Sequence, residues 1–258
     1  MDMESIRQAG IAAAYASGRI LMSKFGHVTS IVKKGSIDLV TEADTEAEQA
    51  IVSTLRACFP NHTLLTEESG HHPGDRENLW IIDPLDGTTN FAHGVPVFAT
   101  SIAFSHSGEV VMGLVHNPVT GELFTAVKGQ GSFLNGKPIR VSDKTRMTDC
   151  LLATGFAYNF KDIIGDIMTR FERCLDASQG VRRLGSAAID LCYVACGRFD
   201  GYFEQNLKPW DTAAGQLIAR EAGAHVTDFS DHPFDPWMVE IAAGNPVVHQ
   251  QLLALLKV

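Results

Sequence analysis

Two carboxylates follow an apolar run in residues 80–90, which read Trp-Ile-Ile-Asp-Pro-Leu-Asp-Gly-Thr-Thr-Asn. Pro84 cannot donate to a sheet ladder and Gly87 tolerates backbone angles closed to other residues, so we predict that a buried strand ends at Asp83 and that the chain then turns sharply. Asp83 and Asp86 would then lie close together, and at low dielectric their repulsion is on the order of several kcal/mol. A hard divalent cation would offset that repulsion. Taken alone, the two residues could also form a structural Asx turn.

Two further carboxylates stand at the ends of predicted elements. Glu67 follows a predicted strand, and Asp211 opens a predicted helix after Lys-Pro-Trp. With Asp83 and Asp86 they form a suitable cage for two or three Mg²⁺ ions, because Mg²⁺ prefers oxygen ligands and retains several waters. In two-metal sites the ions lie ~3.5–4 Å apart and need a bridging carboxylate, for which we predict Asp83. The alternatives are a solvated acid pair at Glu67 and Glu68 and a helix N-cap at Asp211.

Thr88 and Asp44 are the candidates for handling a water molecule. If a helix begins at Gly87, the free N–H groups of its first turn can bind phosphate oxygens. The Thr88 hydroxyl could hold a water, and Asp44, at the end of the segment Asp-Leu-Val-Thr-Glu-Ala-Asp, could accept its proton. Helix capping and turn formation are the alternative roles for Asp38 and Asp44.

The composition limits the classes of protein that the chain can represent. Its 258 residues are 45% hydrophobic, which is ample for a core in one large α/β domain or two closely joined halves. The formal charge of −9 argues against general binding to nucleic acid or to an anionic membrane. Five cysteines without CxxC spacing indicate neither a zinc site nor a complete disulfide framework. The acidic N-terminus and the lack of an apolar run of ~18 residues predict no signal peptide and no membrane span, so we expect a cytoplasmic protein.

Hydrophobic periodicity divides the chain into two unlike halves. Residues 1–146 are expected to be α+β with a largely antiparallel sheet, and residues 147–258 alternate strands and helices as in an α/β fold. We expect the halves to form one catalytic unit, with the boundary at the polar run 142–148. The predicted helices are 4–24, 47–58, 163–175, 186–195, 212–222 and 246–256. The predicted strands are 30–33, 63–66, 80–83, 97–105, 110–116, 123–127, 151–154, 201–204, 225–227 and 239–243, with an exposed loop over 70–78.

The series of motifs resembles the inositol monophosphatase family of metal-dependent sugar phosphatases. The motifs are Asp-Leu-Val-Thr at 38–41 with Asp44, Glu-Glu-Ser at 67–69, D-P-x-D-G-T-x-N at 83–90, Gly-Ser-Ala at 185–187, and Trp-Asp at 210–211 with Ala-Gly at 214–215. The resemblance implies a layered αβαβα sandwich, shared with fructose-1,6-bisphosphatase, and a Mg²⁺-dependent phosphomonoesterase. It implies metal ligation by Glu67, Asp83, the Leu85 carbonyl, Asp86 and Asp211, and catalysis through Asp44, Thr88 and Glu67.

The same resemblance implies a phosphorylated polyol, most directly myo-inositol monophosphate, as the substrate. Its contacts would come from Asp86, Gly87, Thr88, Gly185, Ser186, Ala187, Glu204 and Asp211. Glu204 could instead be a surface charge, and Lys34, which matches a basic family residue near the metals, an ordinary solvated lysine. Fructose bisphosphate, histidinol phosphate, 3′-phosphoadenosine 5′-phosphate and NADP remain alternative substrates. Inhibition by Li⁺ and a homodimer are implied as well.

The rival hypothesis is a regulatory protein that keeps this fold while acting on RNA or RNA polymerase, as some bacterial relatives do. Its expected marks are a basic patch or a damaged metal site, whereas this chain is acidic and its carboxylate set is complete. We therefore expect nucleic-acid machinery only as a secondary partner. A structural Ca²⁺ module is disfavoured because no D-x-D-x-D-G loop occurs.

Overall fold

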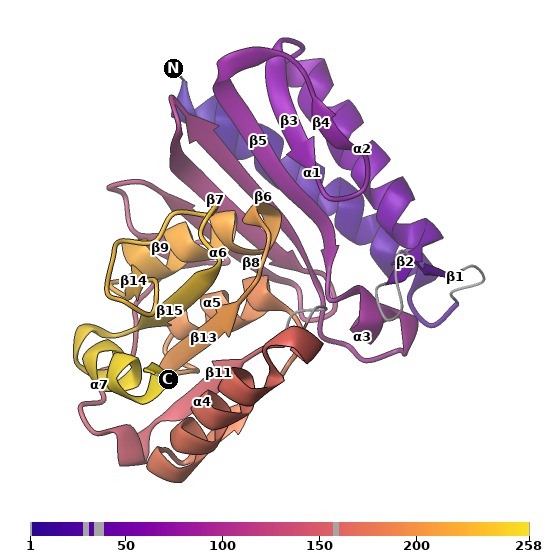
Figure 1. Cartoon of the computed structure of the whole chain (residues 1–258). Coiled ribbons are helices and arrows are strands. Elements are labelled where there is room, and N and C mark those ends of the chain that lie inside the picture. The colour runs from indigo at the N-terminus through magenta and orange to yellow at the C-terminus, as the bar shows by residue number, and fades with distance from the viewer. Residues whose placement is uncertain (1, 28–30, 34–38, 157–159, 258) are drawn as a thin grey trace.

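The computed structural model describes residues 2–27, 31–33, 39–156 and 160–257. Its layers stack in the order helices, sheet, helices, sheet, helices, which confirms the expected αβαβα sandwich (Figure 1). Helices α1 (Met3–Lys24) and α2 (Glu42–Cys58) form the first layer. Within the described ranges, no helix combines the length and the apolar character that crossing a membrane requires.

The second layer is an eight-stranded sheet in the order β10-β9-β8-β7-β6-β5-β3-β4, antiparallel except for the β3–β5 pair. Its strands are β3 (His62–Thr66), β4 (Gly70–His72), β5 (Asp75–Asp86), β6 (Ala99–His106), β7 (Glu109–Asn117), β8 (Glu122–Val127), β9 (Ser132–Leu134) and β10 (Lys137–Ile139). A ribbon of β1 (Ile31–Lys33) and β2 (Leu39–Thr41) lies with the short helix α3 (Thr88–Ala92) near the end of β5 (Figure 1).

Helix α1 is capped at its start and packs closely on the sheet. The Asp2 carboxylate accepts hydrogen bonds from the amides of Glu4 and Ser5, which satisfies two of the free N–H groups of the first turn. Gly18 faces His116 on β7, and a Cβ added to this glycine would lie 2.6 Å from the His116 ring. Small residues on this face of α1 therefore let the helix approach the sheet.

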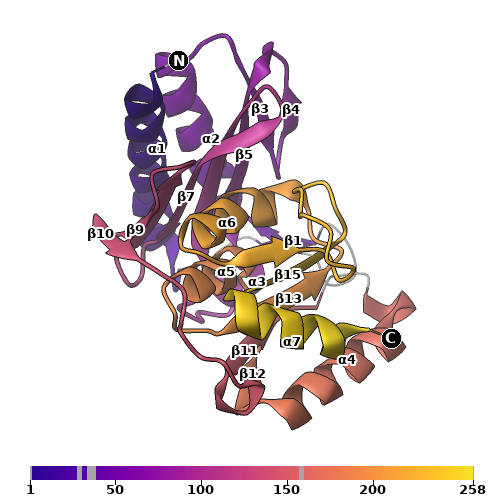
Figure 2. The same cartoon turned by 90° about the vertical axis from the view of Figure 1, so that its left-hand side faces the viewer.

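The third layer consists of α5 (Ala187–Ala195) and α6 (Pro209–Glu221), which lie between the two sheets (Figure 2). The fourth is a five-stranded mixed sheet in the order β12-β11-β13-β15-β14. Its strands are β11 (Leu151–Thr154), β12 (Gly180–Arg182), β13 (Gly201–Gln205), β14 (His225–Thr227) and β15 (Glu240–Gly244). Helices α4 (Ile164–Ala177) and α7 (Pro246–Leu256) cover its outer face, and two 3₁₀ turns span Met147–Asp149 and Phe160–Asp162.

Helix α6 belongs to the second half of the chain but packs on the sheet of the first half. Gly113 on β7 lies so close to it that an added Cβ would be 2.6 Å from the Ala214 carbonyl oxygen. Ser101 on β6 donates a hydrogen bond to the Trp210 carbonyl oxygen at 3.1 Å. The chain passes from one sheet to the other between β10 and β11, and the division into residues 1–146 and 147–258 remains our proposal.

Strand β5 does not end at Asp83, so that prediction was wrong. The strand continues to Asp86, and both aspartates pair with β6 across a shift in register. Pro84 lies within this irregular step, where its missing N–H removes no regular ladder bond. Its carbonyl oxygen accepts a hydrogen bond from Thr100 Oγ1 at 3.0 Å. Proline thus shapes the end of the strand without terminating it.

The exposed loop predicted over 70–78 was also wrong, because β4 and the start of β5 occupy most of it. These residues are polar since they lie towards the edge and end of the sheet, so they lack the apolar alternation that marks a buried strand. Strands β2, β9, β10 and β12 were missed because three residues show no periodicity. The other predicted helices and strands are present with small differences at their ends.

Candidate active site

A pocket of about 620 Å³ opens where β5 ends and where α3, α5 and α6 begin. Every residue predicted to contact metal or substrate lines it. The lining residues are Glu67, Asp83, Leu85, Asp86, Gly87, Thr88, Thr89, Gly155, Phe156, Arg183, Gly185, Ser186, Ala187, Glu204, Asn206, Leu207, Lys208, Trp210, Asp211 and Val239. Asp44 lies directly behind this lining, in contact with Thr88.

Asp83 and Glu67 meet at one edge of the first sheet. Strands β3 and β5 are parallel neighbours with Thr66 opposite Ile82, so the next residues, Glu67 and Asp83, lie side by side. The Glu67 amide donates to the Ile82 carbonyl oxygen at 3.2 Å, which holds Glu67 beside Asp83. Asp83 is only 2% exposed. Burial and then the charges of Glu67, Asp86 and Asp211 raise the pKa of Asp83 well above its usual range.

Asp86 connects the first sheet to the third layer. Its Oδ2 accepts hydrogen bonds from Ser186 Oγ at 2.6 Å and from the Ala188 amide at 2.7 Å. Ser186 also caps α5, because its hydroxyl oxygen accepts a bond from the Ile189 amide. Burial raises the pKa of Asp86 to about 6, against the lowering effect of its hydrogen bonds. The Gly-Ser-Ala motif therefore places α5 against this carboxylate.

Asp211 enters the pocket from the second half of the chain. Helix α6 begins at Pro209, earlier than predicted, because proline suits the first position of a helix. The Asp211 carboxylate accepts a hydrogen bond from the Lys208 amide at 2.7 Å, but Lys208 is the N-cap of α6 and Asp211 lies inside the helix, so the alternative of an N-cap at Asp211 is wrong. Burial and then the charge of Asp86 raise the pKa of Asp211 well above its usual range.

Thr88 and Asp44 contact each other across α3 and α2. Thr88 Oγ1 lies 3.1 Å from Asp44 Oδ1 and 3.0 Å from the Leu85 carbonyl oxygen. The other oxygen of Asp44 accepts bonds from the Thr41 amide and hydroxyl at 2.8 and 2.6 Å, which caps α2. Asp44 thus contacts Thr88, its predicted partner in handling water, and also makes the alternative capping contacts, and burial raises its pKa. Asp38 lies outside the described residues.

Gly87 allows the sharp step between β5 and α3. Its φ of +98° is in the region that favours glycine, and an added Cβ would lie 2.9 Å from the Val97 carbonyl oxygen. Asn90, the last residue of the motif, donates from Nδ2 to the carbonyl oxygens of Val97 and Leu184 at 2.7 and 2.8 Å. The motif therefore binds the loop before α5 as well as forming the pocket.

Glu204 forms another part of the pocket wall, on β13. It is 8% exposed, so the alternative of a surface charge is wrong. Its Oε2 accepts a hydrogen bond from Tyr202 Oη at 2.7 Å, and burial raises the pKa of Glu204 to about 7. Gly155 leaves the space that this carboxylate occupies, since an added Cβ would clash with both of its oxygens. The sequence had not singled out Gly155.

Comparison with known proteins identifies the family. The model of the inositol monophosphatase family matches residues 2–257. The chain belongs to this family. An inositol-1-monophosphatase of Mesorhizobium japonicum is 40% identical over 260 residues, which cover 100% of this chain and 98% of that one. The Nus factor SuhB of Salmonella typhimurium is 43% identical over 262 residues, which cover 98% and 96%. The crystal structure of the extragenic suppressor protein suhB from Bartonella henselae matches with a TM-score of 0.94 at 41% identity, over 98% of each chain.

Two charged residues of this inositol monophosphatase family member were missed as parts of the site. Asp190 on α5 is 1% exposed, and its Oδ1 has no partner among the described residues. Burial and then the charges of Glu204 and Asp86 raise its pKa well above the usual range. Arg183 lines the pocket, and its charge opposes the raised pKa values of these three carboxylates. A lone carboxylate in an apolar helix was the available signal for Asp190.

Glu48 on α2 holds the turn that carries Glu67. Its carboxylate accepts hydrogen bonds from the amides of Glu68 and Ser69 at 2.9 and 3.0 Å and from Ser69 Oγ at 2.5 Å. Ser69 Oγ also lies 2.6 Å from His72 Nε2. Glu67 and Glu68 are both partly buried, so the alternative of a freely solvated acid pair is wrong. The spacing of four residues between Asp44 and Glu48 was the signal that they share one helix face.

The donor set of the pocket fits a divalent cation. Burial and neighbouring carboxylates raise the pKa of both Asp83 and Asp211, and a bound cation would reverse that effect. Within the described residues, no three His, Cys, Asp or Glu side chains converge closely enough to enclose an ion by themselves. Mg²⁺ completes its coordination with waters and carbonyl oxygens, and the Leu85 carbonyl lies at this site. Lys34, which matches a basic family residue near the metals, lies outside the part of the chain that the structure describes.

Proposed function

We propose that the protein hydrolyses myo-inositol monophosphate to inositol and phosphate in a Mg²⁺-dependent reaction. The observation that carries this proposal is that Asp83, Asp86 and Asp211 line one pocket beside the hydrogen-bonded pair of Thr88 and Asp44. Membership of the inositol monophosphatase family supports phosphatase chemistry. The inositol-1-monophosphatase of Mesorhizobium japonicum supports the choice of substrate.

The first step is binding of two or three Mg²⁺ ions by the carboxylate cluster. Their ligands would be Glu67, Asp83, the Leu85 carbonyl oxygen, Asp86 and Asp211. Bound Mg²⁺ would polarise the phosphate oxygens as a Lewis acid and make water a better nucleophile. Asp83 is the bridging candidate, because Glu67, Asp86 and Asp211 all act on its charge.

Asp44 and Thr88 orient and deprotonate the attacking water in this proposal. When the Thr88 hydroxyl donates its single proton to Asp44 or to the Leu85 carbonyl, its lone pairs can accept a hydrogen bond from water. The raised pKa of Asp44 makes its carboxylate a stronger base than an exposed aspartate. Glu67 contributes through its place beside Asp83.

The leaving polyol lies between α5 and β13 in this proposal. Gly87, Thr88 and the Gly185–Ala187 segment line the side towards the phosphate, and Glu204 lines the far side. Only one Glu204 oxygen is engaged by Tyr202, so the other can accept a hydrogen bond from a substrate hydroxyl. Asp86 and Asp211 are the remaining carboxylates within reach of the alcohol. A polyol suits this wall because carboxylates pair well with adjacent hydroxyls.

A substrate panel tests the proposal. We expect the highest kcat/KM for inositol monophosphate, ahead of fructose bisphosphate, histidinol phosphate, 3′-phosphoadenosine 5′-phosphate and NADP. Activity should disappear with a chelator and return with Mg²⁺. Thr89→Ala serves as a control, since Thr89 lines the pocket, is exposed and has no predicted role. Full activity after chelation would contradict the metal, and hydrolysis of none of these esters would contradict the function.

A second role in the transcription machinery is favoured by one observation, the 43% identity to proteins called Nus factor SuhB. If this chain shares such a role, RNA polymerase should be retained by the immobilised protein and equally by its Asp83→Asn variant. Lack of retention above that of an unrelated acidic protein would dismiss this role.

We also propose, from the family, that the protein is a homodimer and that Li⁺ inhibits it. Sedimentation would measure the first property and activity assays the second.

A further inference from the structure

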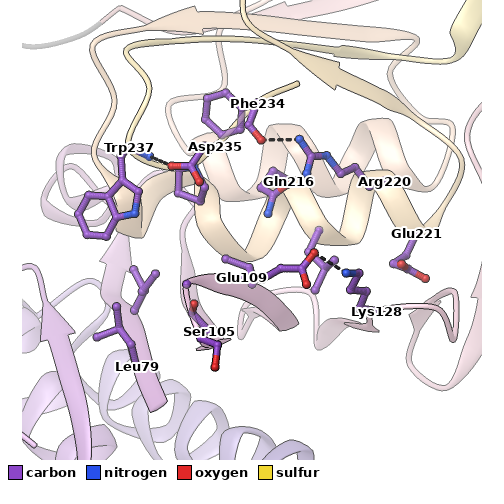
Figure 3. Close-up of a pocket in the computed structure, with 16 residues that line it drawn as sticks. Leu79, Ser105, Glu109, Lys128, Gln216, Arg220, Glu221, Phe234, Asp235 and Trp237 are labelled. Carbon is purple, nitrogen blue, oxygen red and sulfur yellow. Dashed lines mark hydrogen bonds and ion pairs between the residues drawn. The ribbon is translucent and has the colours of Figure 1, made fainter. Parts of the chain in front are cut away.

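A second cavity, of about 550 Å³, lies beside the middle of β5 and the C-terminal end of α6 (Figure 3). One wall comes from β5, β6 and β7, and the other from the last two turns of α6 and the segment 234–237. It shares no lining residue with the active-site pocket. Cavities of about 300–1,000 Å³ are typical of small-molecule sites.

We propose that this cavity binds a small, uncharged, planar heteroaromatic molecule with both hydrogen-bond donors and acceptors, of the size of a nucleobase. The proposal does not depend on the reaction at the other pocket. It is carried by an exposed aromatic ring, a buried amide with an unpaired oxygen, and a rim whose charges are already engaged within the protein.

Trp237 supplies the aromatic surface. It is 60% exposed, which is unusual for so large an apolar side chain. Its backbone is held in place, because the Trp237 amide donates to Asp235 Oδ1 at 3.0 Å. In Figure 3 the indole stands at one end of the cavity, across from Leu79 on β5. A flat ring that enters between them gains stacking on one face and apolar contact on the other.

Gln216 supplies the polar group. Its side chain is on α6, is 3% exposed, and extends towards the strands that form the opposite wall (Figure 3). Its Oε1 has no hydrogen-bond partner in the described part of the chain, and its Nε2 has only a long contact of 3.4 Å with the Ala213 carbonyl oxygen. Rotation about the last side-chain bond can present either amide atom to the cavity. A ligand with an N–H and an acceptor would therefore satisfy a buried group that the protein leaves unpaired.

The charges around the cavity favour a neutral ligand. Lys128 and Glu109 form an ion pair with each other. Glu221 accepts hydrogen bonds from the amides of Gly129 and Gly131 at 2.8 and 2.9 Å. Arg220 donates to the carbonyl oxygens of Val226 and Phe234 at 3.3 and 2.5 Å. Because each of these side chains already has a partner, an ionic ligand would have to displace one, whereas a neutral ring would not.

Adenine and indole are suitable probes, with inositol as the non-aromatic control. We expect saturable binding of adenine, measured by saturation-transfer NMR and calorimetry, and weaker binding of indole, which lacks an acceptor. Trp237→Ala and Gln216→Leu should each weaken adenine binding by about tenfold or more. Tyr15→Ala is the matched control, because Tyr15 is an aromatic residue that is 44% exposed on α1, far from the cavity lining. It should bind as the unaltered protein does.

Circular dichroism of each variant checks that it is folded. If Gln216→Leu does not fold because Gln216 is buried, Trp237→Ala, at an exposed position, still tests the proposal. Inositol and inorganic phosphate with Mg²⁺ should not displace adenine, because they would occupy the other pocket. Absence of saturable adenine binding, displacement by inositol, or equal binding by Trp237→Ala and the unaltered protein would each overturn the proposal. None of these outcomes depends on phosphatase activity.

Discussion

Strand β5 and helix α6 line both pockets: the active site lies where β5 ends and α6 begins, and the second cavity lies beside the middle of β5 and the end of α6. In the active site, burial raises the pKa values of Asp83, Asp86 and Asp211, and neighbouring carboxylates raise those of Asp83 and Asp211 further. In the second cavity, Leu79 and Leu217 line the walls and the rim charges are paired within the protein. The difference shows that uncompensated charge is concentrated where a cation and a phosphate are expected.

Close packing of α6 on the first sheet holds the active-site carboxylates in place. Gly113 lets the Ala214 backbone of α6 approach β7, and Ser101 anchors the first turn of α6 to β6. These buried contacts hold α6 against β6 and β7 despite the repulsion among the active-site carboxylates. Substitutions in the active site, in the packing of α6 and at Glu204 test this comparison.

Asp83→Asn should give the largest effect, because it removes the proposed bridging ligand. We expect a loss of kcat of about 10³-fold or more, as for the removal of other groups central to catalysis. The metal-free variant should also be more stable than the unaltered protein, since one of the mutually repelling carboxylates is gone. Steady-state kinetics and chelator-treated thermal unfolding measure the two effects. Near-normal turnover would refute the bridging role.

Thr88→Ala should lower kcat by about 10²-fold, the scale of acid–base contributions, with a smaller change in KM. The reason is that the hydroxyl linking Asp44 to the Leu85 carbonyl would be lost. Thr88→Ser keeps the hydroxyl and is the matched control, so it should retain most of the rate. Equal loss in both variants would point to packing of the Thr88 methyl group instead of water orientation.

Gly113→Ala should destabilise the protein by about 1–3 kcal/mol, the usual range for overpacking a core. The added methyl group would meet the Ala214 backbone and push α6 away from β7. Urea unfolding measures the loss. Gly165→Ala is the control, since an added Cβ meets nothing within 4 Å there. If both variants were equally stable, α6 would not be held as tightly as this contact indicates.

Glu204→Gln should change how stability depends on pH in the metal-free protein. The folded pKa of Glu204, about 7, lies above its ordinary 4.5, so its stabilising effect is complete below the ordinary value and is lost as the pH rises through about 7. At pH 8 the variant should therefore be more stable than the unaltered protein by ~1–3 kcal/mol. Thermal unfolding with chelator at pH 5 and pH 8 measures the difference. Glu77→Gln, at an exposed position of β5, should show no such dependence, and a matching response there would contradict a specific role for burial.

Much of the fold was predictable because its long elements carry clear periodicity. The helix over 246–256 was predicted with the bounds of α7, and the strands of the antiparallel meander were found as β6, β7 and β8. The segment 70–78 was predicted wrongly because edge strands are polar. Strands of three residues, such as β12, were missed because pairing partners and not local pattern define them.

The candidate site was predictable to the extent that its motifs are local. Asp83, Pro84, Asp86 and Gly87 lie within five positions, so backbone chemistry alone brings the two carboxylates together. Asp190 could not be placed beside the pocket from the sequence, because the carboxylates whose charges act on it, Glu204 and Asp86, come from β13 and from the end of β5. Arg183 was recognised as part of the site only from the structure, which places its charge near Asp190 and Glu204.

The sequence by itself indicated the family, because its motifs are residue types at short spacings, and that resemblance implied the layered fold and the set of carboxylates that line one pocket. Only the tertiary structure decided that Glu204 is buried, that Asp86 is held by the start of α5, and that Asp44 reaches Thr88. The reason is physical: burial and neighbouring charge set the pKa of each carboxylate, and both come from residues distant in the chain. The cavity beside Trp237 and Gln216 is likewise a property of packing between layers, which no local pattern records.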